Sequence, residues 1–285
     1  MLFSMIHMKI LPIFLLIGCL FLTGSLSAHP DHVQALKLLD SQADLAEIKP
    51  LFEKAAADGH APAMAYLGWL YETGQGGEKN PDKAVKWYAA AAENGALKYA
   101  VKLGWIYLQG DLLPRDRALA EQWFVYALNR DYLPANVALG SVYLADALGG
   151  DGRLALKAEA LLTPAFASGD VHAAYFLARL YREGIGDIPA SPERSFGYIL
   201  FGAMHGQAQM QGWLAEAYAQ GAGTAVNLQT AAAWALLAAE GGDPQAEVLI
   251  KQLDAQFSDQ QWLDAWVEAN HYKQQIATVV AECCG

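Results

Sequence analysis

Few residues in this sequence are of the types that carry chemistry, and their spacing matches no known catalytic arrangement. His29 and His32 could chelate a metal ion if His29 began the mature chain, because the terminal amine would add a ligand to the imidazoles. Cys283 and Cys284 could react or pair between chains, since neighbouring cysteines bridge each other only with strain. We expect a solvated terminus and an idle cysteine pair, and we predict no metal site.

The motifs of the common enzyme classes are absent from the sequence. It contains no Ser-x-x-Lys, Gly-x-Ser-x-Gly, His-Glu-x-x-His or Cys-x-x-Cys pattern. Its glycine pairs fall between expected helices and not after a strand, so they do not indicate a phosphate-binding loop. We predict a protein that is not an enzyme and that uses no cofactor, although residues brought together only by the fold could still form a site.

The composition excludes several other classes of protein. Of the 285 residues, 54% are hydrophobic and 17% are charged, which is typical of a packed chain and not of a disordered one. The formal net charge of −11 would repel a phosphate backbone, so we expect no nucleic acid partner. This acidic excess indicates a solvated outer face, and it would also suit a basic partner. No apolar run reaches the roughly 20 residues that cross a bilayer as a helix.

The first 28 residues have the pattern of a secretory signal peptide. Lys9 precedes an apolar stretch over residues 10–22, and Thr23-Gly24-Ser25 then ends it with small residues. Cleavage after Ser27 or after Ala28 fits the small-residue preference of signal peptidases. We therefore expect a periplasmic or secreted protein.

Two details of this leader stay open. Met8 could be the true start in place of Met1, because Met8-Lys9 supplies a short basic segment. Leu16-Ile17-Gly18-Cys19 resembles the lipobox of bacterial lipoproteins, which would make the protein an outer-membrane lipoprotein acylated on Cys19. Against lipidation, the apolar run continues over residues 20–22, where a lipoprotein normally turns polar.

Small and aromatic residues recur along the chain at intervals of 36 residues. The recurring residues are Gly68, Gly104 and Gly140, Tyr71, Tyr107 and Tyr143, and Trp87 and Trp123. The register continues, slightly stretched, through Leu177-Ala178 and Leu214-Ala215, which gives five units. A period of this length indicates a repeat architecture in which each unit buries its apolar face against its neighbours.

Each unit divides into two expected helices. Residues 61–72 and 81–93 have apolar side chains at i, i+3, i+4 and i+7. Asn80-Pro81-Asp82 and Ser191-Pro192-Glu193 each place a capping side chain, a proline and an acid at a helix start. We expect the small column from Gly68 onward to let the paired helices approach closely, and the repeated tyrosines and tryptophans to be core residues.

These residues resemble the Sel1-like repeat, a relative of the tetratricopeptide repeat with a longer inter-helix loop. The matching pattern is Ala63-x3-Leu67-Gly68-x2-Tyr71-x2-Gly74-x-Gly76, followed by Lys83-Ala84-x2-Trp87-Tyr88-x2-Ala91-Ala92-x2-Gly95. The third unit departs from it, because Gly149-Gly150-Asp151-Gly152 lengthens the loop and Leu161 replaces tryptophan. The resemblance implies an all-α fold, an α-solenoid of about five helix-turn-helix repeats with capping helices at both ends.

The resemblance also implies how the chain is divided. We expect a signal peptide over residues 1–28, N-terminal capping helices over 29–58, repeats over 59–243, and C-terminal capping helices with a tail over 244–285. In the last segment we expect residues 244–253, and the helix that holds Trp262 and Trp266 at i and i+4, to cover the final exposed layer. The tail from Tyr272 onward mixes polar and apolar residues and receives no assignment.

In tetratricopeptide-like units the first helix of each pair lines the concave side, so its positions free of packing indicate a binding surface. Residues at these positions are Trp69, Glu72, Lys98, Trp105, Val137, Ser141, His172, Tyr175, Arg179, Arg182 and Glu216. We expect Trp69 and Trp105 to stack in adjacent units, with Arg179 and Arg182 as a cationic cluster for carboxylates. The alternative is that either tryptophan packs under a neighbouring helix.

The resemblance further implies a function in binding other proteins. We expect a periplasmic scaffold or adaptor whose concave face holds a protein or peptide partner during assembly or regulation of an envelope complex. The alternatives are an outer-membrane lipoprotein that organises polysaccharide export and, with no catalytic residues to support it, a cell-wall hydrolase.

Overall fold

The computed structural model describes residues 29–41, 44–75 and 77–284, and this part of the chain folds into 14 α-helices. The helices are α1 (Pro30–Asp40), α2 (Leu45–Ala57), α3 (Ala61–Thr73), α4 (Pro81–Glu93), α5 (Lys98–Gln109), α6 (Arg117–Leu128), α7 (Pro134–Leu148), α8 (Leu154–Ala167), α9 (Val171–Glu183), α10 (Pro192–Met204), α11 (Ala208–Gln220), α12 (Leu228–Glu240), α13 (Pro244–Asp254) and α14 (Asp259–Cys284). The one extended pairing in the described ranges is an isolated bridge between Ile185 and Ile188. The predicted all-α class is confirmed.

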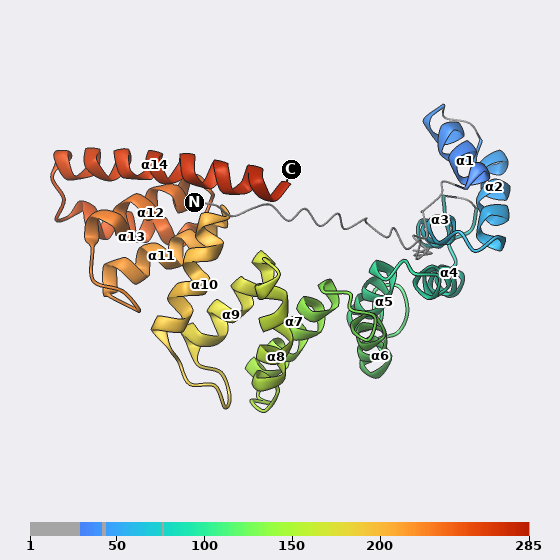
Figure 1. Cartoon of the computed structure of the whole chain (residues 1–285), viewed down its shortest axis with the longest axis horizontal. Helices are drawn as coiled ribbons and strands as arrows, with labels where there is room; N and C mark the ends of the chain where they lie inside the picture. The colour runs from blue at the N-terminus through green and yellow to red at the C-terminus, as the bar shows by residue number, and fades with distance from the viewer. Residues whose placement is uncertain (1–28, 42–43, 76, 285) are drawn as a thin grey trace, which may run out of the picture.

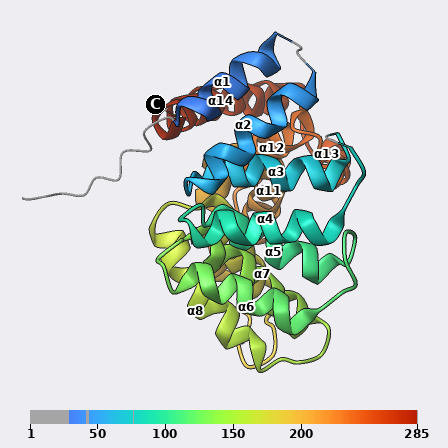
Figure 2. The same ribbon diagram turned by 90° about the vertical axis from the view of Figure 1, so that its right-hand side faces the viewer.

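The helices stack as consecutive hairpins into a curved array. Each odd-numbered helix from α3 to α11 packs against the next helix to form a unit, and the second helix of that unit packs against the first helix of the following one. Figure 1 shows the hairpins following an arc from α1 to α14, and Figure 2 shows α2 to α6 lying one over another. The predicted α-solenoid is therefore confirmed.

The first helices form the inner side of the array. α5 contacts α7 directly across a unit boundary, and α7 contacts α9 in the same way. No contact of that extent joins α4 with α6, or α6 with α8, in this part of the chain. A curved stack crowds its inner layer and spreads its outer one, so the first helices line the concave face.

The small column of the repeats works as the sequence predicts. A Cβ atom added to Gly68 would lie 2.7 Å from the Tyr88 ring, and one added to Gly104 would lie 2.4 Å from the Phe124 ring. Such distances are too short for any real Cβ, so these positions accept only glycine without rearrangement. The close approach lets the large ring of the second helix fill the unit's core.

The predicted helix starts are also present. The Asn80 side chain accepts a hydrogen bond from the Lys83 backbone N–H at 2.9 Å, and Ser191 accepts one from Arg194 at 3.4 Å. Asp116 caps α6 in the same way, through the Leu119 N–H at 2.9 Å. Each cap satisfies an N–H group that the helix itself leaves without a partner.

Helix α14 is 26 residues long, and its second half is the segment from Tyr272 onward that received no assignment from the sequence. It packs against α12 and α10, with Trp262, Ala265, Ala269 and Tyr272 toward the apolar core. Trp266 lies on the opposite side and is 59% exposed, so α14 packs on the array through the face that holds Trp262, without Trp266. The buried residues of α14 recur at steps of three and four positions, and this series does not include position 266.

Two sequence-based expectations concern the leader. The predicted signal peptide, including Cys19 of the lipobox pattern, lies outside the described residues. Among the helices of the described ranges, none combines the length and apolar character needed to cross a membrane.

Candidate functional site

The inner face carries a continuous apolar depression between α5, α7 and α9, called here the central trough. It consists of two adjoining hollows of about 350 and 330 Å³ that share Trp105, Ser141 and Phe176. The remaining lining residues are Val101, Leu108, Arg115, Arg117, Pro134, Val137, Ala138, Val142, Ala145, Asp146, Asp170 and His172. Hollows of this size, with apolar walls and few polar groups, are typical of binding surfaces.

Trp105 is anchored at the centre of this trough. It is half-buried, and its ring meets Phe124 edge to face with the centroids 5.4 Å apart and the planes at 74°. An edge-to-face pair fixes the ring beyond what its burial alone would do. The indole therefore presents a preorganised apolar surface, which is the property of residues that dominate binding energy at interfaces.

The rim of the central trough is closed by an ion pair between two units. Arg117 at the start of α6 donates to the Asp146 carboxylate of α7 through both terminal guanidinium nitrogens, Nη1 and Nη2, and Nη1 lies 3.1 Å from Oδ1. A bidentate pair of this kind holds the guanidinium and the carboxylate in one relative orientation. It ties the second unit to the third at the position where the trough crosses between them.

A second depression lies at the N-terminal end of the inner face and is mainly aromatic. Its lining residues are Pro62, Ala65, Tyr66, Trp69, Tyr88, Tyr99 and Lys102, around a volume of about 280 Å³. Glu72 borders it and accepts hydrogen bonds from Tyr88 and from Lys102, the latter at 2.6 Å. Burial alone would raise the pKa of Glu72, but these two donors outweigh it and lower the pKa. Glu72 is therefore an ionised carboxylate used within the fold.

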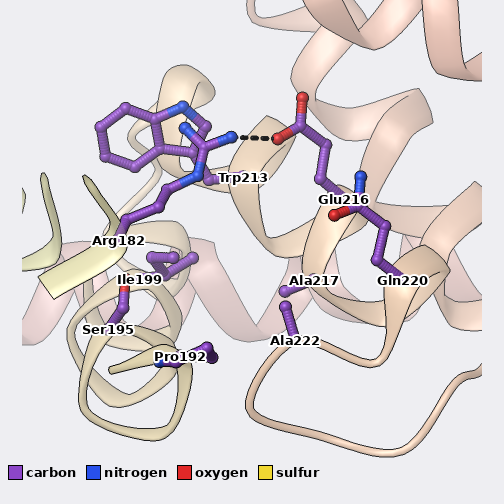
Figure 3. A pocket seen from close by; sticks show the side chains of 9 residues that line it. All are labelled: Arg182, Pro192, Ser195, Ile199, Trp213, Glu216, Ala217, Gln220 and Ala222. Carbon is purple, nitrogen blue, oxygen red and sulfur yellow. Dashed lines mark hydrogen bonds and ion pairs between the residues drawn. The ribbon is translucent and has the colours of Figure 1, made fainter. Parts of the chain in front are cut away.

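A third depression, shown in Figure 3, lies between α9, α10 and α11 and has a volume of about 240 Å³. Arg182 forms an ion pair with Glu216 across its mouth, and its guanidinium lies 4.9 Å from the centre of the Trp213 ring. Tyr175 stacks on Trp213 with the centroids 5.3 Å apart and the planes at 15°. Tyr175, Trp213 and Arg182 together form a ridge of flat groups on the inner face.

The structure brings several predicted site residues together and separates others. Trp105, Val137, Ser141 and His172 meet in the central trough, while Arg182 and Glu216 meet at the third depression. The expected stacking of Trp69 and Trp105 is wrong. The two residues stand a full unit apart, and each ring packs against a nearer aromatic ring. The Trp69 ring lies beside Tyr66, with the centroids 5.2 Å apart, and the Trp105 ring lies beside Phe124.

The predicted cationic cluster is also different from what the sequence indicated. Arg179 pairs with Glu183 one turn along α9 at 2.8 Å, and Arg182 pairs with Glu216 of the next unit. Lys98 lies 5.2 Å from the centre of the Tyr99 ring. Glu183 and Glu216 therefore neutralise the two arginines that were expected to be free cations.

Sequence reasoning missed two aromatic residues of the inner face, Phe176 and Trp213. Both stand two positions before the small column, a place that Tyr66 and Lys102 occupy in the first two units. Position −2 lies about 200° around the helix from the small residue, so it too can face the groove. Aligning this second column would have found both residues.

The described residues hold no set of three His, Cys, Asp or Glu side chains placed to bind a metal ion. The site is thus a hollowed, aromatic inner face stabilised by ion pairs between units. A curved all-α array with such a face is the class of solenoid that presents an extended surface to other molecules.

The chain belongs to the Sel1 repeat family. The family model matches residues 61–95, 98–132, 171–207 and 208–243. The unit over α7 and α8 lies between the matched segments, as its departures from the repeat pattern predict. The expected lengthening of its loop is wrong, because α7 continues to Leu148 and leaves only residues 149–153 between the two helices. A comparison with curated proteins gives no match.

Solved structures, among them the following two, share the fold. The Escherichia coli protein c5321, described as a protective antigen of uropathogenic strains with an SLR fold, is similar with a TM-score of 0.68 and 24% identity. That match covers 82% of this chain and 50% of the E. coli chain, so this chain spans half of its length. A Sel1 repeat protein from Oxalobacter formigenes gives a TM-score of 0.63 and 21% identity, covering 87% of this chain and 97% of the other.

Proposed function

We propose that this protein is a non-catalytic scaffold that binds a protein partner along its inner face, with the central trough as the main contact. Sel1 repeats commonly act in protein–protein interaction. The observation that carries the proposal is the half-buried Trp105, held by Phe124 at the centre of an apolar depression shared by three units. An anchored aromatic residue in such a hollow is the usual centre of a binding surface.

The charges of the inner face favour an apolar anchor over an ionic one. Arg117, Arg182 and Lys102 each already have a carboxylate partner from a neighbouring unit. A partner that took one of these cations would leave an acid without its counter-charge, which offsets much of the gain. The partner we propose therefore inserts aliphatic or aromatic side chains beside Trp105 and Phe176, and makes polar contacts at the rim.

Site-specific crosslinking tests this surface. A photoreactive phenylalanine analogue placed at Val137, in the central trough, should give a discrete crosslinked partner in cells that express the full chain. The same analogue at Trp266, which is exposed on α14 and far along the sequence, is the matched control. Equal yields of the same adduct from both positions would contradict the assignment of the inner face.

We further propose that the protein works in the periplasm, where it serves assembly or regulation of an envelope complex. This location rests on the leader pattern of Lys9, the apolar residues 10–22 and the small residues that follow. Mass spectrometry of the N-terminus from fractionated cells tests it. A mature chain that starts at Ala28 or His29 supports export, an acylated Cys19 supports the lipoprotein alternative, and an intact leader in the cytoplasmic fraction contradicts both.

A further inference from the structure

Three histidines from separate parts of the sequence meet where the N-terminal hairpin joins the first repeat. His29 precedes α1, His32 lies in its first turn, and His60 precedes α3. The His60 ring stands between the other two, with centroids 4.6 Å from His32 and 5.6 Å from His29. These residues are called the histidine cluster below. It links α1 to the first repeat, whereas the rest of α1 packs along α2.

Each imidazole of the cluster has one nitrogen that is buried and has no hydrogen-bond partner. These nitrogens are Nδ1 of His29, Nδ1 of His32 and Nε2 of His60. A neutral imidazole tolerates this arrangement, because the unpartnered nitrogen is then the one that carries a lone pair. At His32 and His60, protonation of the unpartnered nitrogen would place a new N–H, and a positive charge, where no acceptor lies within hydrogen-bond distance.

The charged groups around the cluster do not compensate His32 and His60. Asp58, at the end of α2, lies 3.1 Å from Nε2 of His29, and Asp31 in α1 lies 3.7 Å from Nδ1 of the same ring. Lys54 of α2 forms an ion pair with Asp31, with Nζ 3.1 Å from a carboxylate oxygen. The carboxylates therefore face His29 and Lys54, while His32 has the Phe52 ring beside it, with the centroids 5.4 Å apart.

We propose that the histidine cluster makes the docking of α1 sensitive to acid, so that α1 separates from α2 and from the first repeat as the pH falls below neutrality. Separation would uncover the apolar surface on which Ala35 packs, including Ile48 and Phe52, which are completely buried in the closed form. This is a property of the N-terminal hairpin and does not depend on the proposed partner-binding surface.

The expected direction follows from the titration of the two less compensated rings. Burial, then the neighbouring His60 and His29, lower the pKa of His32; burial, then His29, lower the pKa of His60. A histidine whose pKa is lower in the folded state binds its proton more readily once released. The docked form is therefore fully stable above the ordinary histidine pKa of about 6.5 and loses stability as the pH falls through the lowered values.

Hydrogen exchange measured by mass spectrometry on the full chain tests the proposal. Samples at pH 7.5, 6.5 and 5.0 contain EDTA, and rates are converted to protection factors so that the intrinsic pH dependence cancels. We expect the protection of residues 30–40 to fall by up to about tenfold for each pH unit over which opening takes up one proton. Protection of α11 and α12 should stay constant and serves as the internal reference.

Variants decide whether the histidines cause the change. His32→Gln/His60→Gln should flatten the pH dependence of α1 protection, and His32→Gln alone should reduce it if the double variant folds poorly. His271→Gln, an exposed histidine on α14, should keep the wild-type pH dependence. The proposal is overturned if α1 protection does not change with pH, if the loss spreads equally over all helices, or if it persists in the double variant.

Discussion

The first and the last repeats of the array differ in what covers their outer helices. Trp87 of α4, Trp123 of α6 and Trp234 of α12 occupy the same column of the repeat. The first two remain half-buried, but Trp234 is only 1% exposed because Tyr272 of α14 stacks on it with the centroids 4.5 Å apart. The same repeat position is thus a partly open surface in one region and a closed core in another. The difference shows that α14 seals the outer side of the last units.

The largest effect should come from removing the sealed tryptophan. Trp234→Ala leaves a cavity under α14 and should lower the free energy of unfolding by about 3–5 kcal/mol. Trp266→Ala, on the exposed side of α14, should change it by no more than about 0.5 kcal/mol. Denaturant unfolding of both variants measures this. Similar losses in the two would mean that α14 does not cover the repeats as described.

The glycine column offers a second, smaller test within the repeats. Gly104→Ala forces a Cβ atom against the Phe124 ring, so we expect a loss of about 1–3 kcal/mol in unfolding free energy. Gly197→Ala is the matched control, since nothing lies within 4 Å of its added Cβ and it sits inside helix α10. It should gain about 0.5–1 kcal/mol. A stabilised Gly104→Ala variant would contradict the close approach of α5 and α6.

A third test compares a tyrosine of the repeats with a tyrosine of α14 at alkaline pH. Burial and a hydrogen bond to Glu121 raise the pKa of Tyr143 in α7 to about 12, and burial with a hydrogen bond to Glu268 raises the pKa of Tyr272 in α14 to about 12. A pKa raised in the folded state contributes stability below the unfolded value near 10, and that contribution is lost as the pH rises toward 12.

Tyr143→Phe and Tyr272→Phe should therefore each reduce the loss of stability between pH 10 and 12, because phenylalanine has no proton to release. Thermal unfolding at pH 8.5 and at pH 11 measures the loss for wild type and for both variants. Equal losses in all three proteins would show that neither hydroxyl resists ionisation in the fold.

The fold could be predicted from the sequence because the same packing residues recur in successive units. Gly68 and Gly104 recur with a large residue twenty positions later, Tyr88 and Phe124, and each pair meets in the structure. A helix that occurs once lacks this information. Nothing in the repeat pattern fixes which face of residues 259–284 is buried, so the sequence alone does not distinguish the packed Trp262 from the exposed Trp266.

The sequence was enough to locate the inner face, but it did not predict the side-chain contacts that join neighbouring units there. The positions of Trp105, Ser141 and His172 follow from the repeat register, and they share the central trough. Pairing between units does not follow, because Arg182 and Glu216 are 34 residues apart and meet only once the units stack. The same is true of Trp213, whose ring reaches Tyr175 of the preceding unit.

Affinity for the crosslinked partner tests the central claim most directly. Titration of that partner into Trp105→Ala/Phe176→Ala should show a loss of about 30-fold or more, which corresponds to about 2 kcal/mol for a principal contact residue. Ser141→Arg, which fills the trough without removing core packing, should weaken binding in the same way, and Trp266→Ala should bind like wild type. Unchanged affinity in both trough variants, with their helical content intact, would contradict binding through the inner face.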